Sequence, residues 1–181
     1  MPQRVLIAGV TGVGKSTLGK RLSELWDLPY TNLDKLHWGP GWTERPTFRE
    51  EALTLAASGQ WITEWQYGSK GIRQVLAERA DTLIWLNLPR RIALPRLYRR
   101  TFTRWLSGEE AYQGCRERAP WTAFTDENHI FRWEIKTHGN FRKAMPAQVM
   151  RYPHITFIEL RTPSEVRRWL AGPVQGHPGD A

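Results

Sequence analysis

Short apolar runs alternate along the chain with segments whose apolar residues recur at helical spacing. Runs of this kind are typical of strands that are buried on both faces of a parallel sheet. They cover residues 4–9, 30–33, 61–63, 82–88 and 155–160. The alternation predicts a three-layer α/β fold, in which helices cover both faces of a five-stranded parallel sheet and ligands bind at the carboxyl ends of the strands.

Helices are predicted between these runs. Leu18, Leu22 and Leu25 recur on one helix face directly after the first run. Two more helices are expected over residues 47–58 and 71–79, between the second and the fourth run.

Two further helices flank the fifth run. The first is expected from about residue 126 toward 145, and Pro146 should end it because proline lacks the N–H that would continue the helix. The second opens at residues 162–165, Thr-Pro-Ser-Glu, which form a capping box with proline at the first helical position, and Gly172 closes it.

An arginine-rich stretch follows the fourth run. Arg96, Arg100 and Arg104 recur every four residues and therefore share one face of a predicted helix, which Pro95 should kink or start. Residues 107–121 hold glycines and charges and are expected to form a mobile connection. The arginines of the whole stretch are Arg90, Arg91, Arg96, Arg99, Arg100, Arg104, Arg116 and Arg118.

The totals fit one cytoplasmic domain. With 181 residues, 40% of them apolar, the chain can bury one core, so we expect a single domain over residues 1–172 and a disordered tail over 173–181. No segment approaches the roughly 18 apolar residues of a membrane helix, and the start lacks the features of a secretory signal. The single cysteine, Cys115, fits a reducing compartment.

The strongest motif lies between the first run and the first helix. Residues 9–16 satisfy the phosphate-loop pattern G-x-x-x-x-G-K-S/T, whose glycines let backbone N–H groups and a helix N-terminus face phosphate oxygens. Lys15, expected to be exposed, should reach the β- and γ-phosphates of ATP, and Ser16 should bind Mg²⁺. The expected ATP-binding residues are Gly9, Thr11, Gly12, Val13, Gly14, Lys15, Ser16 and, through its hydroxyl or only by packing, Thr17.

The chain has no N-K-x-D guanine signature and no room for the accessory domains of motor ATPases, so a small kinase remains. Three segments besides the phosphate loop carry a specific resemblance to a known family. They are residues 32–40, which contain Leu-Asp-Lys-Leu-His-Trp, residues 61–67, and residues 88–91, which are Leu-Pro-Arg-Arg. Over residues 4–170 the chain resembles the adenylate-kinase-related proteins known as DNA topology modulation proteins. The resemblance implies a P-loop NTPase fold with sheet order 2-3-1-4-5 and a helical, arginine-rich lid over about residues 96–121.

Two acids follow predicted strands. Asp34 falls where shikimate-kinase-like enzymes carry an acid that contacts the acceptor and the magnesium shell; its alternative role is to cap the next segment, which serine or asparagine would do equally well. Glu64 ends the third strand and is expected to hold Mg²⁺ through water. Trp65 follows it where the resembled families have glycine, and should fill space left there for an acceptor.

If residues 96–121 form a lid, its arginines are expected to act on phosphate groups. Arg96, Arg100 and Arg104 are expected to neutralise the charge on the transferring phosphoryl group, although for any single one a solvated basic face is an equally good interpretation. Arg161, after the fifth strand, is expected to border adenine. His37, beside Trp38, is more typical of a structural residue.

The prediction is an ATP-dependent phosphotransferase that moves the γ-phosphoryl group to a small acceptor. We favour a nucleotide or related planar molecule, because many arginines surround the site and Trp38, Trp42 and Trp65 offer rings that could sandwich it. Two alternatives stay open. One is a kinase acting on a small hydroxyl metabolite. The other is an ATP-switched DNA-binding protein, since ten tryptophans and a net charge of +8 also suit nucleic acid.

Overall fold

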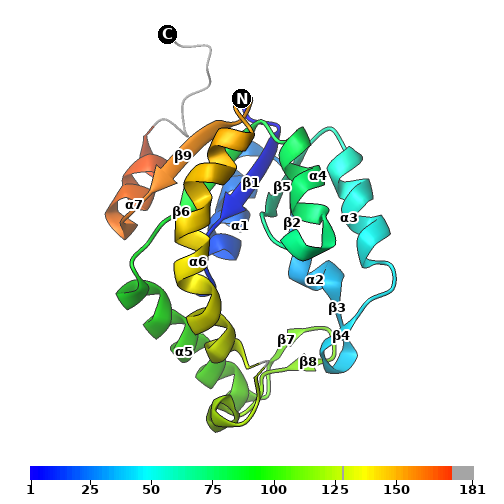
Figure 1. Ribbon diagram of the computed structural model, residues 1–181, viewed down its shortest axis with the longest axis vertical. Coiled ribbons are helices and arrows are strands. Elements are labelled where there is room, and N and C mark those ends of the chain that lie inside the picture. Colours follow the sequence, from blue (N-terminus) through cyan, green and yellow to red (C-terminus); the bar gives the residue numbers. More distant parts are fainter. Residues whose placement is uncertain (128, 173–181) are drawn as a thin grey trace.

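The computed structural model describes residues 1–127 and 129–172, so the tail expected over residues 173–181 lies outside the described part. A five-stranded parallel sheet forms the centre (Figure 1). Its order is β2, β5, β1, β6, β9, which are the second, third, first, fourth and fifth of these strands along the chain. Their bounds are β1 Arg4–Ala8, β2 Tyr30–Thr31, β5 Trp61–Glu64, β6 Thr82–Leu86 and β9 Thr156–Leu160.

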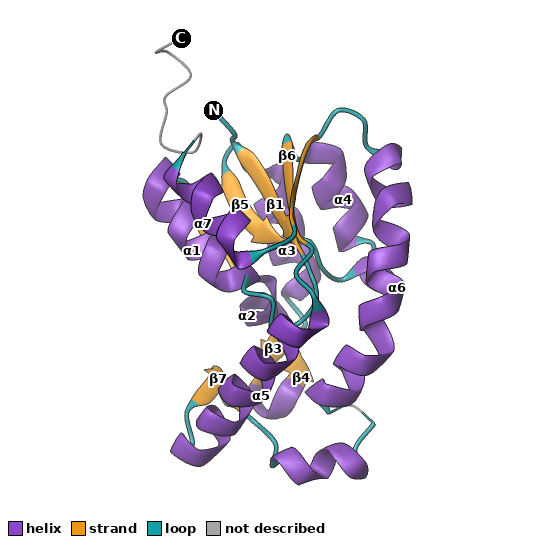
Figure 2. Ribbon diagram, turned by 90° about the vertical axis from the view of Figure 1, so that its left-hand side faces the viewer, coloured by secondary structure: helices purple, strands orange, loops and turns teal. Residues whose placement is uncertain are grey.

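Helices cover both faces of this sheet (Figure 2). On one face lie α1 (Lys15–Trp26) and α7 (Pro163–Ala171). On the other lie α3 (Phe48–Ala57), α4 (Ile72–Arg79) and α6 (Ile130–Arg151). The α/β architecture expected from the alternating pattern is therefore confirmed.

The central strand β1 shows why its sequence is a continuous apolar run. Val5 and Ile7 pack in the cluster that contains α1 and α7, whereas Leu6 and Ala8 pack in the cluster of α3, α4 and α6. Successive side chains of a strand point to opposite faces, so a strand buried on both faces needs apolar residues at every position.

The part of the molecule where the sequence led us to expect the acceptor is built from short elements after β2. The helix α2 (Leu33–His37) leads into a small arm, residues 38–44, which we call the acceptor arm. It comprises β3 (Trp38–Gly39), the 3-10 helix η1 (Pro40–Trp42) and β4 (Thr43–Glu44). In Figure 1 this arm lies beside the segment that follows α5.

The arginine-rich region contains more regular secondary structure than the sequence predicted. The helix α5 (Arg90–Ser107) begins five residues before Pro95 and continues through it, so that proline does not mark its start. The expected mobile connection contains a hairpin of β7 (Glu110–Tyr112) and β8 (Cys115–Arg116), followed by the 3-10 helix η3 (Pro120–Phe124). We call residues 110–116 the lid hairpin.

The end predicted for the long helix at Pro146 is wrong, because α6 continues to Arg151. Met145 is fully buried and Val149 packs against the same core, so burial on both sides of the proline outweighs one lost helical hydrogen bond. None of the helices in the described residues is long and apolar enough to cross a membrane.

Candidate active site

The phosphate loop joins β1 to α1 at the carboxyl edge of the sheet. Gly9, Gly12 and Gly14 have φ angles of +151°, +81° and +107°, which only glycine adopts freely. At Gly12 the backbone also comes close to α5, since an added Cβ would lie 2.6 Å from the carbonyl oxygen of Ala93. The loop therefore needs its glycines both for its path and for its contact with α5.

Lys15 and Ser16 both turn toward Glu64. The Ser16 hydroxyl donates to Oε1 of Glu64 at 2.6 Å, and Nζ of Lys15 lies 3.8 Å from Oε2. Nζ also donates to the carbonyl of Val10 at 3.3 Å. The expectation that Lys15 is exposed is therefore wrong: it is 9% exposed, because its ammonium turns back onto the loop and this carboxylate.

Glu64 is held by a ring of donors. Its register neighbour on β1 is Ile7, which places its carboxylate next to the start of the phosphate loop. Tyr30 donates to Oε1 at 2.8 Å and Gln66 to Oε2 at 2.6 Å. Burial and then the nearby Glu64 raise the pKa of Tyr30, so its hydroxyl stays protonated and donates. A buried carboxylate is tolerated here because it is paired and hydrogen-bonded.

The chemistry of this group suits magnesium. The Ser16 hydroxyl and the Glu64 carboxylate are hard oxygen ligands, which Mg²⁺ prefers, and it usually takes its other ligands from phosphates and water. Among the residues that the structure describes, no cluster of three or more His, Cys, Asp or Glu residues could hold a metal ion. Protein ligands here would therefore complete only part of an ion's shell.

Asp34 lies in the first turn of α2, half-buried. The cap of this helix is Asn32, whose side chain accepts from the backbone N–H of Asp34 at 2.8 Å, so capping does not account for Asp34. Its carboxylate instead accepts from two phenols, Tyr67 at 2.5 Å on Oδ1 and Tyr112 at 3.1 Å on Oδ2. Burial and the charge of Glu64 raise the pKa of Asp34, and the hydrogen bond from Tyr67 is the largest effect opposing them.

The three tryptophans expected around an acceptor do not lie together. Trp65 is 2% exposed and packs in the core, with its indole N–H donating to the carbonyl of Arg73 and that guanidinium 3.9 Å above its ring. It therefore neither fills the acceptor site nor stacks on a ligand there. Trp38 and Trp42 contact each other edge to face on the acceptor arm, with ring centroids 5.6 Å apart.

His37 has the structural surroundings that the sequence favoured. It is 4% exposed, and the centroid of its ring lies 4.4–4.6 Å from the ring centroids of Trp38, Phe48 and Tyr67. Burial lowers the pKa of His37, which keeps the imidazole neutral.

The lid arginines divide into different environments. Arg96 Nη1 donates to the carbonyl of Val13 at 3.4 Å, which places this guanidinium on the phosphate loop. Arg100 acts on the hydroxyl of Tyr112, where its charge opposes the rise in the pKa of that phenol. Arg104 instead lies 3.6 Å from the carboxylate of Glu117.

Arg161, at the end of β9, is held by two carboxylates. The guanidinium of Arg161 donates to Glu159 at 2.9 Å, and its backbone N–H donates to the Glu165 carboxylate at 2.7 Å as part of the α7 cap. Asn87, at the end of β6, donates to the same Glu159 at 2.6 Å. Thr17 is exposed on α1.

Sequence reasoning missed the tyrosines. Tyr30, Tyr67 and Tyr112 donate to Glu64 or Asp34 from three separate segments. Tyr67 follows the third predicted strand, so its position at the carboxyl edge of the sheet could have drawn attention to it, whereas Tyr30 opens the second predicted strand. Tyr112 lies in a stretch without periodic pattern, and no sequence signal marks it.

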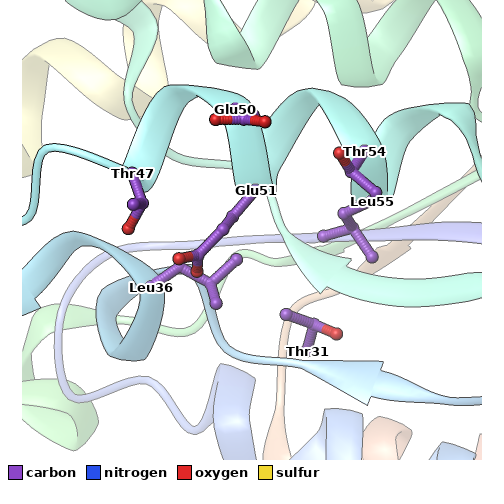
Figure 3. Close-up of a pocket in the computed structure, with 7 residues that line it drawn as sticks. All are labelled: Thr31, Leu36, Thr47, Glu50, Glu51, Thr54 and Leu55. Carbon is purple, nitrogen blue, oxygen red and sulfur yellow. The ribbon is translucent and has the colours of Figure 1, made fainter.

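A separate open groove runs between α3 and the segment of β2 and α2 (Figure 3). Its volume is about 500 Å³, and it is lined by Thr31, Leu36, Thr47, Glu50, Glu51, Thr54 and Leu55. No residue of the phosphate loop lines it. Within this lining, the carboxylate of Glu51 is paired with Arg45 at 2.6 Å.

Comparison with solved structures places the chain among P-loop kinases in fold. A shikimate kinase from Acinetobacter baumannii, in complex with shikimate, has a TM-score of 0.53 at 16% identity over 96% of this chain and 91% of that one. A shikimate kinase from Bacteroides thetaiotaomicron has a TM-score of 0.51 at 14% identity, over 94% and 95%. No family model and no curated protein matches the sequence. The chain therefore has a P-loop kinase fold.

Proposed function

We propose that the protein is an ATP-dependent kinase that transfers the γ-phosphoryl group to a small acceptor bearing a hydroxyl group. The observation that carries this proposal is the pairing of two sites at one sheet edge: Lys15 and Ser16 of the phosphate loop on Glu64, and Asp34 bonded by hydroxyl groups. The first suits a magnesium-bound nucleotide and the second suits an alcohol.

On the nucleotide side, the roles follow from charge and position. Lys15 would bind the β- and γ-phosphates, and Ser16 with Glu64 would position Mg²⁺, directly and through water. Arg96, whose guanidinium already lies on the loop at Val13, is the lid arginine best placed to neutralise charge on the transferring group. Arg161 would border the base from the end of β9.

On the acceptor side, the surroundings of Asp34 favour a hydroxyl over a phosphate. The charge of Glu64 already acts on Asp34, and two carboxylates repel an incoming phosphate. An alcohol must lose its proton as the new P–O bond forms, and a positioned carboxylate can take it. A phosphate acceptor, already ionised, needs no such base.

Part of the positive charge that favoured a nucleotide acceptor is paired with carboxylates. Arg90 lies 3.0 Å from Glu134, and Arg104 and Arg161 also pair with carboxylates. An ion-paired guanidinium contributes less charge to a second anion. A kinase of small hydroxyl compounds, which the sequence left as an alternative, therefore becomes the preferred form of the proposal. One structure with this fold, a shikimate kinase bound to shikimate, supports an acceptor of small size.

The test is the variant Lys15→Ala, with Lys20→Ala on the exposed side of α1 as the matched control. Loss of the ammonium should weaken ATP binding by roughly 100-fold or more, because charge-assisted contacts to phosphate are lost. Glu64 keeps its bonds from Ser16, Tyr30 and Gln66, so the fold should survive. Calorimetric ATP binding by Lys15→Ala at the strength of Lys20→Ala would refute the proposal.

An ATP-switched DNA-binding protein is the second candidate, and exposed aromatic residues on η3 and at the start of α6 favour it. Trp121, Phe124 and Trp133 are 60%, 87% and 56% exposed, and such rings can stack on unpaired bases. Binding of single-stranded DNA through several phosphates should weaken steeply between low and high salt. If the protein binds no single-stranded DNA even at low salt, this candidate is excluded.

A further inference from the structure

The lid hairpin is docked on the acceptor arm. The backbone N–H of Gly41 donates to the carbonyl of Gly114 at 2.9 Å, and the indole N–H of Trp42 donates to the carbonyl of Arg116 at 2.8 Å. Gly114 leaves no room for a side chain, since a Cβ there would lie 2.8 Å from Cβ of Pro40. Two segments that are about 70 residues apart in sequence are therefore tied together by one backbone hydrogen bond, one bond from a side chain to the backbone, and close packing.

The same contact buries Cys115 between the acceptor arm and the lid hairpin. Its side chain is fully buried, and its thiol donates to the carbonyl of Gly39 at 3.0 Å. The ring of Tyr112 contacts that of Trp42 edge to face, with centroids 6.0 Å apart. Docking of the hairpin thus fixes where Tyr112 points.

Tyr112 points at Asp34, and the two bonds on that carboxylate are not alike. Tyr67, from the segment directly after β5, donates to Oδ1 at 2.5 Å. Tyr112, from the lid hairpin, donates to Oδ2 at the longer distance of 3.1 Å. The bond on Oδ2 is the weaker of the two and comes from a surface hairpin, so Oδ2 is the oxygen that another donor could take over.

The hydroxyl of Tyr112 presents to Asp34 the same group that an alcohol acceptor would present. Burial, Asp34 and Glu64 raise the pKa of Tyr112, so the phenol remains a protonated donor throughout the physiological range. Water, which would otherwise be activated by this carboxylate, meets an oxygen that is already bonded.

We propose that Tyr112 is a specificity-determining residue that caps Oδ2 of Asp34 against water and yields that oxygen only to the hydroxyl of an acceptor. The inference rests on the proposed function, in which Asp34 is the base on the acceptor side. In the transfer step, the acceptor oxygen bonds to the γ-phosphorus, the bond from that phosphorus to ADP breaks, and the acceptor proton passes to Oδ2. With water in place of the acceptor, the same step would waste ATP.

The test is hydrolysis of ATP without any acceptor by Tyr112→Phe, which keeps the ring on Trp42 and removes only the hydroxyl. We expect the rate of ADP release to rise about tenfold, part of the roughly 10²–10⁴-fold that a positioned base contributes. Tyr98→Phe is the matched control, because it also removes a phenol hydroxyl after β6. Tyr98 is 42% exposed, and its ring lies tilted against that of Phe131. This control should leave the rate unchanged.

Two further measurements show whether the effect passes through Asp34. The double variant Tyr112→Phe with Asp34→Asn should lose the increase. The bond from Tyr112 lowers the pKa of Asp34, so the acid limb of the hydrolysis profile should move to higher pH in Tyr112→Phe. A purely structural tyrosine would not move that limb.

The inference is overturned if Tyr112→Phe hydrolyses ATP no faster than Tyr98→Phe, or if the increase persists in the double variant. Calorimetric ATP binding separates this failure from failure of the proposed function. Intact ATP binding with unchanged hydrolysis removes only the role of Tyr112, whereas ATP binding that survives Lys15→Ala removes the kinase proposal itself.

Discussion

The proposed phosphate side and the proposed acceptor side of the candidate site are built in opposite ways. On the phosphate side, residues 9–16 run consecutively from β1 into α1, and Glu64 is added by the neighbouring strand. On the acceptor side, Asp34, Tyr67 and Tyr112 come from three segments, and 78 residues separate the first from the last. A site made of consecutive residues can be recognised as a motif, whereas one assembled across the chain depends on how distant segments dock.

The two sides also differ in electrostatics. Cationic Lys15 and Arg96 lie at the phosphate loop, while the acceptor side offers a carboxylate and phenols. This division suits a reaction in which a polyanion meets a neutral alcohol. The following changes test one side while leaving the other intact.

The largest effect is expected from Asp34→Asn, which alters only the acceptor side. Loss of the base should lower kcat by roughly 10²–10⁴-fold, while ATP affinity stays near that of the wild type. The wild-type kcat should fall on acidification as Asp34, whose pKa is raised, takes up its proton, and the variant should lack that limb.

The acceptor for these kinetics comes from a thermal-shift screen of hydroxyl metabolites and nucleotides in the presence of a non-hydrolysable ATP analogue, since a ligand of the native state raises Tm. A raised acceptor KM with unchanged kcat in Asp34→Asn would instead indicate a phosphate acceptor, for which Asp34 only orients.

A smaller effect is expected from Gly12→Ala, which alters only the phosphate side. The backbone at φ +81° disfavours a side chain, and the new Cβ would meet both Ala93 and Leu97 of α5 within 3 Å. The free energy of unfolding should fall by about 1–3 kcal/mol, and ATP binding should weaken because the loop must move.

Gly41→Ala is the control for this change. Its φ is +67°, but nothing lies within 4 Å of an added Cβ, so only the backbone cost of about 1–2 kcal/mol applies. Thermal unfolding and calorimetric ATP binding measure both variants. Equal ATP affinity in Gly12→Ala and Gly41→Ala would show that the contact with α5 does not shape the loop.

The sheet and the phosphate loop were largely predictable, because their signals are local. The apolar run that became β1 has a buried residue at each position from Val5 to Ala8, and the cap of α7 forms at Thr162 and Glu165 as its sequence indicated. The elements after α5 were not predictable in the same way. The lid hairpin has glycines and charges without period, and its strands are held by pairing and docking.

The positions and exposures of single residues at the site were also predicted only in part. The strand order that the resemblance implied puts the third strand beside the first, and Glu64 indeed lies next to Ile7 at the start of the phosphate loop. The sequence misjudged Lys15 and Trp65, whose exposure depends on which neighbours fold over them.

By itself, the sequence determined the backbone path of the phosphate loop, since glycines at positive φ between a buried strand and a helix permit that path and few others. It also determined which residues carry charge and which are buried in the strands. Only the tertiary structure decided what faces Asp34. The acceptor arm and the lid hairpin are joined by a backbone bond between Gly41 and Gly114, and by the side chains of Trp42 and Cys115, which donate to backbone carbonyls. Every residue offers such a carbonyl, so the sequence does not show which segments meet and bring Tyr112 to the carboxylate.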